Sequence, residues 1–161
     1  MIVELNDTEV LICTQVAMMR NQIARAAGVK DKLVWKQGNK LRIETIGVMA
    51  ELAFCKWANI YPELDVKAQS GTTDVIYQGW KCDIKATERA DGRLLVSQSK
   101  KKESSDVYIL GIIDGNSVDF SGYALTDDIM QEANLKDLGY GPTFCMAQDQ
   151  LTRFKDASQV A

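Results

Sequence analysis

The chain has 161 residues and a formal net charge of −3, and its overall composition is that of an ordinary globular protein. This length most simply indicates one domain over residues 1–161, with enough chain to bury a substantial core without crosslinks. There is no histidine, so Ser-His-Asp and Cys-His catalysis, histidine-based zinc hydrolysis and histidine-metal nucleases are excluded.

The four cysteines stand far apart without a C-x-x-C spacing, so neither a zinc site nor a disulfide framework is expected. No apolar run approaches the roughly 18 residues that a membrane span requires, and the N-terminus lacks the basic-then-apolar pattern of a signal peptide. We therefore expect a cytoplasmic protein without a membrane partner.

The first expected element is an amphipathic helix over residues 7–27. Its apolar residues recur at helical spacing, Asp7 or Thr8 can cap its start, and Gly28 ends it.

A basic run overlaps the end of this helix and continues to residue 42. Residues 20–42 hold a single acidic side chain, Asp31, so the run departs from the negative charge of the whole chain. It is either a solvated surface or a patch that faces nucleic-acid phosphates. The run also includes Lys30 and Lys32, and our candidates for phosphate contacts are Arg20, Arg25, Lys36, Lys40 and Arg42.

A second helix is expected over residues 41–60, with a wide apolar surface. Glu44, Gly47 and Glu51 share one stripe of it, at spacings of three and four residues. Because glycine weakens a helix by roughly 1 kcal/mol relative to alanine, Gly47 indicates the close approach of another backbone. That approach would bring Glu51 to the sheet, although a surface glutamate is the simpler alternative.

Residues 72–87 contain two strand-like runs around the pair at positions 78–79, which predicts a tight hairpin. In this register Val75 lies opposite Cys82 and Asp74 lies opposite Asp83. Side chains alternate between the faces of a strand, so one face of the hairpin belongs to the core. The other face carries charge, from Asp74, Lys81, Asp83 and Lys85.

Directly opposed carboxylates on paired strands repel each other, because their β-carbons lie only about 5 Å apart. A divalent cation such as Mg²⁺ would relieve the repulsion between Asp74 and Asp83. Glu51 can add a third carboxylate, and Lys85 projects from the same face of the strand as Asp83. The alternative is an exposed sheet face with a simple pair between lysine and aspartate.

The rest of the chain predicts a mixed sheet with helices on its faces, in the α/β class and of the α+β type. Lys100, Lys101 and Lys102 lie between strands, either in a solvated turn or as a second contact to phosphate. We expect strands over residues 64–68, 93–97, 106–113, 118–124 and 143–146, and helices over residues 126–133 and 148–158.

These residues resemble the PD-(D/E)XK nuclease superfamily. Asp74 followed after a short hairpin by Asp83-Ile84-Lys85 is similar to its D…(D/E)-x-K core, and a helix bearing Glu51 precedes it. Thr73 replaces the proline of the family name, a variable position that makes no metal contact. The later segments, from Asp106-Val107-Tyr108 through Gly122-Tyr123-Ala124 to Gly141-Pro142-Thr143, look like small phage-type members.

The resemblance implies a restriction-endonuclease-like core and an endonuclease of phage-type DNA metabolism, located in the host cytoplasm if a phage encodes it. Asp74 and Asp83 would bind Mg²⁺ or Mn²⁺, with the Ile84 carbonyl and Glu51 completing the site. Lys85 would orient the attacking water and neutralise the scissile phosphate. Glu44 and Gln98 are accessory candidates, although an ordinary loop glutamine is an equal reading of Gln98.

The expected partner is DNA, and a homodimer is expected because cutting both strands requires two sites. Two other functions stay open. The fold can persist as a DNA-binding or assembly module that lacks catalysis, or the same carboxylates can serve a small-molecule metal hydrolase.

Overall fold

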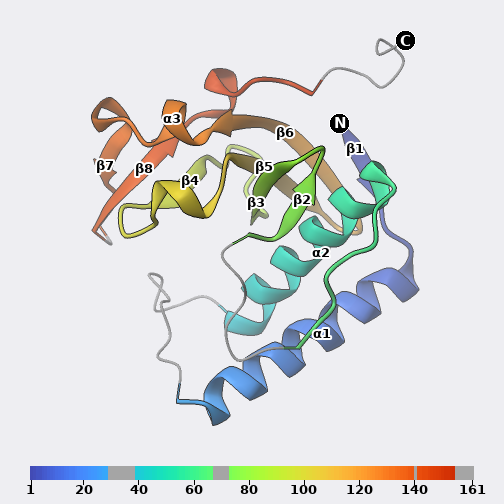
Figure 1. The fold of residues 1–161 in the computed structure, drawn as a ribbon. Coiled ribbons are helices and arrows are strands. Elements are labelled where there is room, and N and C mark those ends of the chain that lie inside the picture. The colour runs from blue at the N-terminus through green and yellow to red at the C-terminus, as the bar shows by residue number, and fades with distance from the viewer. Residues whose placement is uncertain (29–38, 67–72, 140, 155–161) are drawn as a thin grey trace.

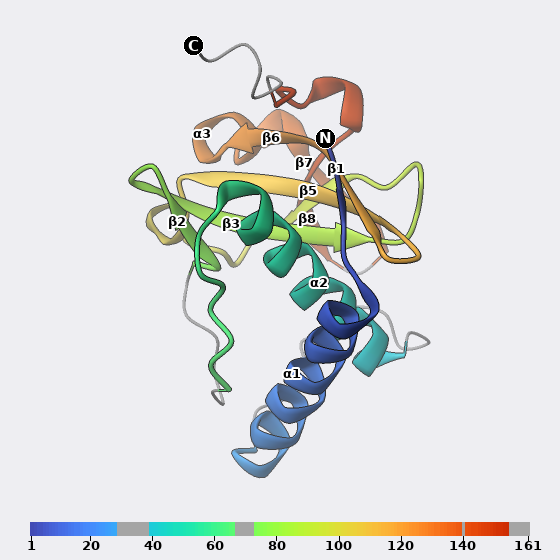
Figure 2. The same ribbon diagram turned by 90° about the vertical axis from the view of Figure 1, so that its right-hand side faces the viewer.

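The computed structural model describes residues 1–28, 39–66, 73–139 and 141–154. Figure 1 shows two long helices on one side of a five-stranded sheet, of which the second lies against the sheet and the first packs on the second. A second sheet, of three strands, lies on the other side together with short helical turns (Figure 2). The chain therefore has the mixed α+β architecture that its sequence predicts.

Helix α1 spans Asp7–Ala26, close to the predicted range. Its cap is Asn6, whose side-chain oxygen accepts a hydrogen bond from the Glu9 N–H at 2.9 Å. The Glu9 carboxylate in turn accepts one from the Asn6 N–H at 2.7 Å, which completes a capping box. The predicted caps, Asp7 and Thr8, are wrong because both residues already lie in the first turn.

Helix α2 spans Lys40–Ala58, so it begins one residue before the predicted range of residues 41–60 and ends two residues before the end of that range. The side chain of Asn39 caps its start by accepting from the Arg42 N–H at 3.3 Å. Asn59 ends it in the left-handed conformation, with φ of 52°. None of the helices in the described part of the chain combines the length and the apolar character needed to cross a membrane.

The central sheet has the strand order β1-β6-β5-β3-β2. β3 and β5 are parallel, and the other neighbouring strands are antiparallel. The strands are β1 (Ile2–Glu4), β2 (Val75–Tyr77), β3 (Trp80–Thr87), β5 (Val107–Asp114) and β6 (Ser117–Leu125). The sequence predicts β5 and β6 within about a residue at each end, but gives no indication of the three-residue β1.

The second sheet has the strand order β4-β8-β7 and is antiparallel throughout. Its strands are β4 (Leu94–Ser97), β7 (Leu135–Asp137) and β8 (Pro142–Met146). The short helical elements are η1 (Lys102–Ser104), α3 (Thr126–Ile129), η2 (Glu132–Asn134) and η3 (Gln148–Gln150). β4 and β8 were predicted as strands, and β7 was not.

Three predicted elements differ from the structure. Residues 64–66 lie in no strand, and residues 67 and 68 of that prediction fall outside the described part of the chain. The helix predicted over residues 126–133 is only the single turn α3, followed by η2. The closing helix predicted over residues 148–158 is wrong through residue 154: η3 ends at Gln150 and Thr152 forms a bridge to Tyr123, while residues 155–158 are not described.

The central sheet has a separate core on each face. Val75, Cys82 and Ile84 pack with the helices in the first core, which confirms the predicted core face of the hairpin. Tyr108 belongs to the second core, between the two sheets. The charged face of the hairpin is therefore covered at Asp83, which is only 2% exposed, whereas Lys81 on the same face is exposed. All four cysteines are buried free thiols.

The close approach of α2 to the sheet occurs at Ala50 and not at Gly47. A β-carbon added to Gly47 would meet no atom of the described residues within 4 Å, so the prediction for this glycine is wrong. A β-carbon on Gly111 of β5 would instead lie 3.5 Å from the Ala50 side chain and 3.1 Å from Val118. The close approach of Ala50 to Gly111 sets the position of α2 relative to β5, and with it the position of the next residue, Glu51, relative to the sheet.

Candidate active site

β2 and β3 form the predicted hairpin. The two turn residues at positions 78–79 have φ values of 50° and 85°, as a type I′ turn requires. Val75 lies opposite Cys82, which confirms the predicted register. Asp74 immediately precedes β2, and Asp83 follows Cys82 in β3, so the two carboxylates come from neighbouring positions although the strand pairing itself ends at Val75 and Cys82.

Asp74 lies one residue before β2 begins, and its side chain contributes a hydrogen bond to β3 there. Its N–H donates to the Cys82 carbonyl at 3.1 Å, and its Oδ2 accepts from the Ile84 N–H at 2.7 Å. The carboxylate thus takes the place of a backbone acceptor at the edge of β3. Because the N–H and C=O of one strand residue point to the same edge, the Ile84 carbonyl faces the Asp74 side.

The Asp83 carboxylate is buried between the sheets and contacts two ammonium groups. Lys85, two residues along the same strand, forms an ion pair with Oδ1. Lys100 Nζ lies 2.6 Å from Oδ2 and donates a hydrogen bond to it. A carboxylate that is 2% exposed needs such partners, because an unpaired buried charge costs several kcal/mol, on the order of 3–5.

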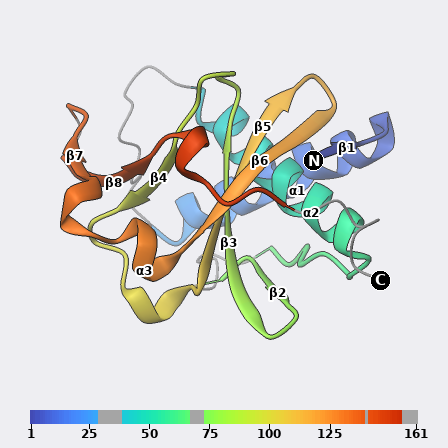
Figure 3. The same cartoon turned by 90° about the horizontal axis from the view of Figure 1, so that it is seen from above.

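The sequence assigned Lys100 to a solvated turn or to contact with nucleic acid, and its contact with Asp83 was missed. Lys100 follows β4 in the second sheet, and its N–H donates to the Ser97 carbonyl at 3.0 Å. The segment after Lys100 is tied to the start of the hairpin, since the Thr73 hydroxyl donates to the Ser104 carbonyl at 2.9 Å. Figure 3 shows the segment that follows β4 next to the strands of the hairpin. Packing of the two sheets against each other brings Lys100 to Asp83, and no local pattern encodes this contact.

Glu51 reaches the site from α2. Its Oε2 lies 3.2 Å from Arg20 Nη1, and its side chain is 22% exposed. Burial, followed by the negative charge of Asp74, raises the pKa of Glu51 to about 7, while the charge and hydrogen bond of Arg20 and the charge of Lys85 act in the opposite direction. The carboxyl is therefore close to half ionised at neutral pH.

The pKa of Asp74 is shifted by causes of the same kind. Burial, followed by the charge of Asp83, raises the pKa of Asp74 above its ordinary value. The hydrogen bond from Ile84 and the charges of Lys85 and Lys100 act in the opposite direction. Glu51, Asp74 and Asp83, which we call the carboxylate cluster, are thus linked electrostatically around Lys85.

Arg20 is a structural clamp beside the carboxylate cluster. Besides its ion pair with Glu51, it donates to the Glu63 carbonyl at 2.8 Å and to the Asp65 carbonyl at 3.3 Å. These contacts connect α1 to α2 and to the segment that leads from α2 towards the hairpin. The predicted phosphate contact of Arg20 remains untested, but its guanidinium already has three protein acceptors.

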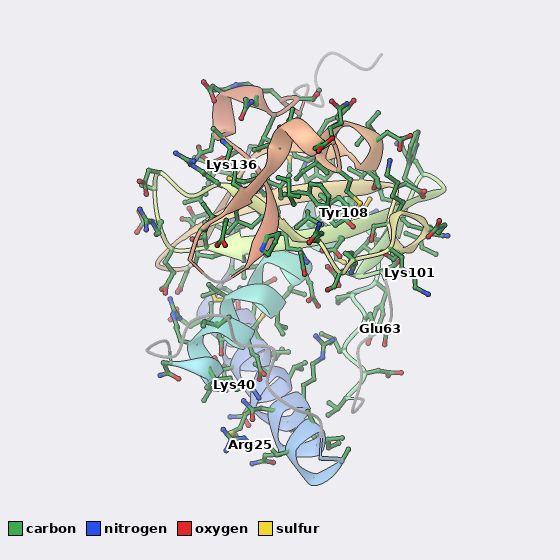
Figure 4. All side chains as sticks on the ribbon, turned by 90° about the vertical axis from the view of Figure 1, so that its left-hand side faces the viewer. Arg25, Lys40, Glu63, Lys101, Tyr108 and Lys136 are labelled. Carbon is green, nitrogen blue, oxygen red and sulfur yellow. The ribbon has the colours of Figure 1, made fainter. Side chains whose placement is uncertain are left out.

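The other predicted nucleic-acid contacts that fall among the described residues lie in two separate places. Arg25 is exposed on α1, Lys40 lies 3.8 Å from Glu44, and Arg42 pairs with Glu88 at 2.6 Å. In Figure 4, Arg25 and Lys40 lie beside the helices, whereas Lys101 lies apart from them at the level of the sheets. Lys101 is exposed and Lys102 pairs with Asp127 at 3.1 Å, while Lys36, like Lys30 and Lys32, is outside the described residues.

The two accessory candidates stand apart from the carboxylate cluster in different ways. Glu44 lies about two turns before Glu51 on α2, and its second carboxylate oxygen is buried without a hydrogen-bond partner among the described residues. Gln98 is exposed in the turn after β4, two residues before Lys100. The buried Tyr108 hydroxyl also lacks a described hydrogen-bond partner, and it lies close enough to influence Lys100.

The carboxylate cluster suits a hard divalent cation in its chemistry, because Mg²⁺ and Mn²⁺ prefer carboxylate and carbonyl oxygens. The spacing of the cluster, however, is too wide for all three carboxylates to hold one ion, because within the described residues no three acidic or cysteine side chains lie close enough together to do so. Asp74 and Asp83 are the neighbouring pair, and two ammonium groups contact the oxygens of Asp83. A cation at this pair would therefore compete with the lysines.

Comparisons of the chain with protein-family models, with curated proteins and with solved structures find no match. Function is accordingly argued from the geometry and chemistry of the site.

Proposed function

We propose that this protein is a metal-dependent endonuclease of phage-type DNA metabolism that hydrolyses phosphodiester bonds. The carboxylate cluster carries this proposal: burial and the charge of a neighbouring carboxylate raise the pKa values of Glu51 and Asp74, and Asp83 of β3 lies beside Lys85. A protein gains no stability from such an arrangement, because repulsion and desolvation both disfavour it. Perturbed carboxyl groups gathered in this way are typical of functional sites.

The architecture supports a restriction-endonuclease-like core of the PD-(D/E)XK kind. β3 carries Asp83 and Lys85 in a mixed sheet, parallel to the buried strand β5. α2 packs on one face of this sheet and presents Glu51 towards the hairpin side. These are the placements that the resemblance implies for an acid helix and a D-x-K strand.

In this proposal Asp74 and Asp83 hold Mg²⁺ or Mn²⁺, with the Ile84 carbonyl on the Asp74 side and Glu51 on α2. The bound ion supplies a water of lowered pKa and neutralises charge that develops on the phosphate. Lys85 is rooted in β3 beside Asp83, where its ammonium can orient the attacking water and contact the scissile phosphate. Arg20 keeps Glu51 turned towards the cluster.

Cleavage of supercoiled plasmid and of single-stranded DNA tests the proposal. We expect the wild type to cut with Mg²⁺ and to stop in EDTA, and we expect Asp83→Asn to lower the rate by roughly 100-fold or more. Asp128→Asn is the matched control, because Asp128 is an exposed aspartate of α3. Equal rates for the wild type and for folded Asp83→Asn would remove the proposal.

A second function, as a nuclease-like DNA-binding or assembly module without catalysis, is favoured by the spacing of the cluster. Two lysines already neutralise Asp83, and among the described residues no third carboxylate or cysteine side chain lies close enough to the pair to share an ion. Retention of plasmid DNA in a gel-shift assay, unaffected by EDTA and without cleavage products, would support this function. For either function, the affinity for DNA should fall steeply as salt is added.

A further inference from the structure

The two lysines on Asp83 are held in different ways. Lys85 belongs to the middle of β3, where its neighbour across the parallel pair is Leu110 of β5. Lys100 belongs to the turn between β4 and η1, and its side chain is 29% exposed. In the proposed function Lys85, whose side chain is 37% exposed, orients the attacking water and contacts the scissile phosphate, whereas that mechanism assigns no role to the ion pair of Lys100 with Asp83.

The ammonium group of Lys100 is placed directly against the Asp83 carboxylate. Its Nζ lies 2.6 Å from Asp83 Oδ2 and donates a hydrogen bond to it. The Lys100 ammonium therefore supplies one positive charge at the pair of aspartates on which a divalent ion is proposed.

We propose that Lys100 is an internal substitute for the metal ion: it holds the Asp83 carboxylate while the site is empty of metal and is displaced when a divalent ion binds. This inference rests on the proposed function and describes the regulation of the same site. It accounts for a carboxylate that bears two ammonium groups when one would neutralise it. The metal affinity of the wild type is then the intrinsic affinity of the site reduced by the competing ammonium.

Titration of Mn²⁺ into the metal-free protein, followed by calorimetry, tests the proposal. We expect Lys100→Met to bind Mn²⁺ about tenfold more tightly than the wild type, because the competitor is gone. Lys101→Met is the matched control, since it removes a neighbouring lysine that is exposed on the same turn, and it should change the affinity less than about twofold. Lys100→Gln provides a second, polar variant if the methionine variant does not fold.

Thermal unfolding gives an independent readout. Without metal, Lys100→Met should unfold at a lower temperature than the wild type, because Asp83 loses one of its two partners. Saturating Mn²⁺ should restore most of that loss, so the rise in Tm is larger for the variant than for the wild type. An equal rise in both proteins would count against displacement of Lys100.

The outcomes separate this inference from the function on which it rests. If the wild type binds Mn²⁺ through Asp83 and the folded Lys100 variants bind equally or more weakly, the inference is overturned and the proposed function stands. If neither the wild type nor the variants bind Mn²⁺, both are overturned. Binding of Mn²⁺ by the Lys100 variants and not by the wild type would support the inference, because the Lys100 ammonium would then block the site completely.

Discussion

Burial raises the pKa of Glu51 to about 7, above the ordinary value of 4.5, so ionisation is less favourable in the folded protein than in the unfolded chain. Between these two values the folded state holds more protons than the unfolded state. The contribution of Glu51 to stability is therefore fully present below about pH 4.5 and is lost as the pH rises through 7. A site residue that lowers stability at neutral pH is more readily explained by function than by folding.

The first prediction concerns Glu51→Gln, which mimics the protonated carboxyl at every pH. In EDTA, the free energy of unfolding of the wild type should fall relative to that of the variant by about 1–3 kcal/mol between pH 5 and pH 8. Urea denaturation at the two pH values measures the difference. Glu132→Gln, at an exposed glutamate of η2, is the control, and a parallel pH dependence for wild type and Glu51→Gln would refute the prediction.

At the scale of residues, the sequence could predict those site members that a local pattern links. Asp74, Asp83 and Lys85 belong to one hairpin, whose turn and alternation fix their mutual positions. Lys100 lies 17 residues from Asp83 in another sheet, so its ion pair follows only from the tertiary fold. The contact of Arg20 with Glu51 spans 31 residues and was equally hidden, because a basic run on a helix is compatible with many partners.

Arg20 acts at the scale of elements, because its guanidinium joins α1, α2 and the segment after α2. Charge-assisted hydrogen bonds of this kind are about twice as strong as neutral ones. The clamp also lowers the pKa of Glu51, so it holds this carboxylate both in place and in its ionised form. Loss of the clamp should therefore be felt most where Glu51 is charged.

The second prediction is that Arg20→Gln destabilises the protein by about 1–3 kcal/mol at pH 8 and by less at pH 5, where Glu51 is protonated. Chemical denaturation at the two pH values provides the measurement. Arg25→Gln is matched in residue type and helix, and its exposed side chain should make the change nearly neutral. An equal loss for both variants, or no dependence on pH, would show that the clamp has been misassigned.

At the same scale, the sequence predicted the long helices and the longer strands because hydrophobic periodicity extends over many residues there. The three-residue strands β1 and β7 are too short to show a period. The closing helix fails for a tertiary reason. Thr152 and Tyr123 exchange backbone hydrogen bonds at 2.8 and 2.9 Å, which holds the chain extended where its sequence favours a helix.

The third prediction contrasts two glycines. Gly47→Ala should stabilise the protein by about 0.5–1 kcal/mol, because the position is helical and open towards the described residues. Gly122→Ala should destabilise it by about 1–3 kcal/mol, because the new β-carbon would lie 2.8 Å from the Thr152 carbonyl oxygen. Melting temperatures of the two variants decide the matter, and effects of equal sign would contradict the packing described for α2 and β6.

At the scale of the whole molecule, the two cores place the site where three layers meet. α2 supplies Glu51 from one side of the central sheet, and the turn after β4 supplies Lys100 from the second sheet on the other side. The sequence indicated a mixed sheet with helices, but not the second sheet. The sequence left an exposed sheet face open as the alternative for the charged side of the hairpin, whereas the second sheet, in which β4 and β8 pair across roughly 50 residues of chain, lies on that side and Asp83 is buried there.

The central claim is that the carboxylate cluster binds a divalent metal ion, and calorimetric titration of Mn²⁺ into the wild type and Asp74→Asn tests it most directly. Asp74→Asn keeps the shape of the side chain that contacts Ile84 but removes its charge. We expect saturable binding by the wild type and by the surface control Asp128→Asn, with at least about tenfold weaker binding by Asp74→Asn. Binding that is absent from the wild type, or identical in the folded Asp74→Asn variant, would contradict the claim.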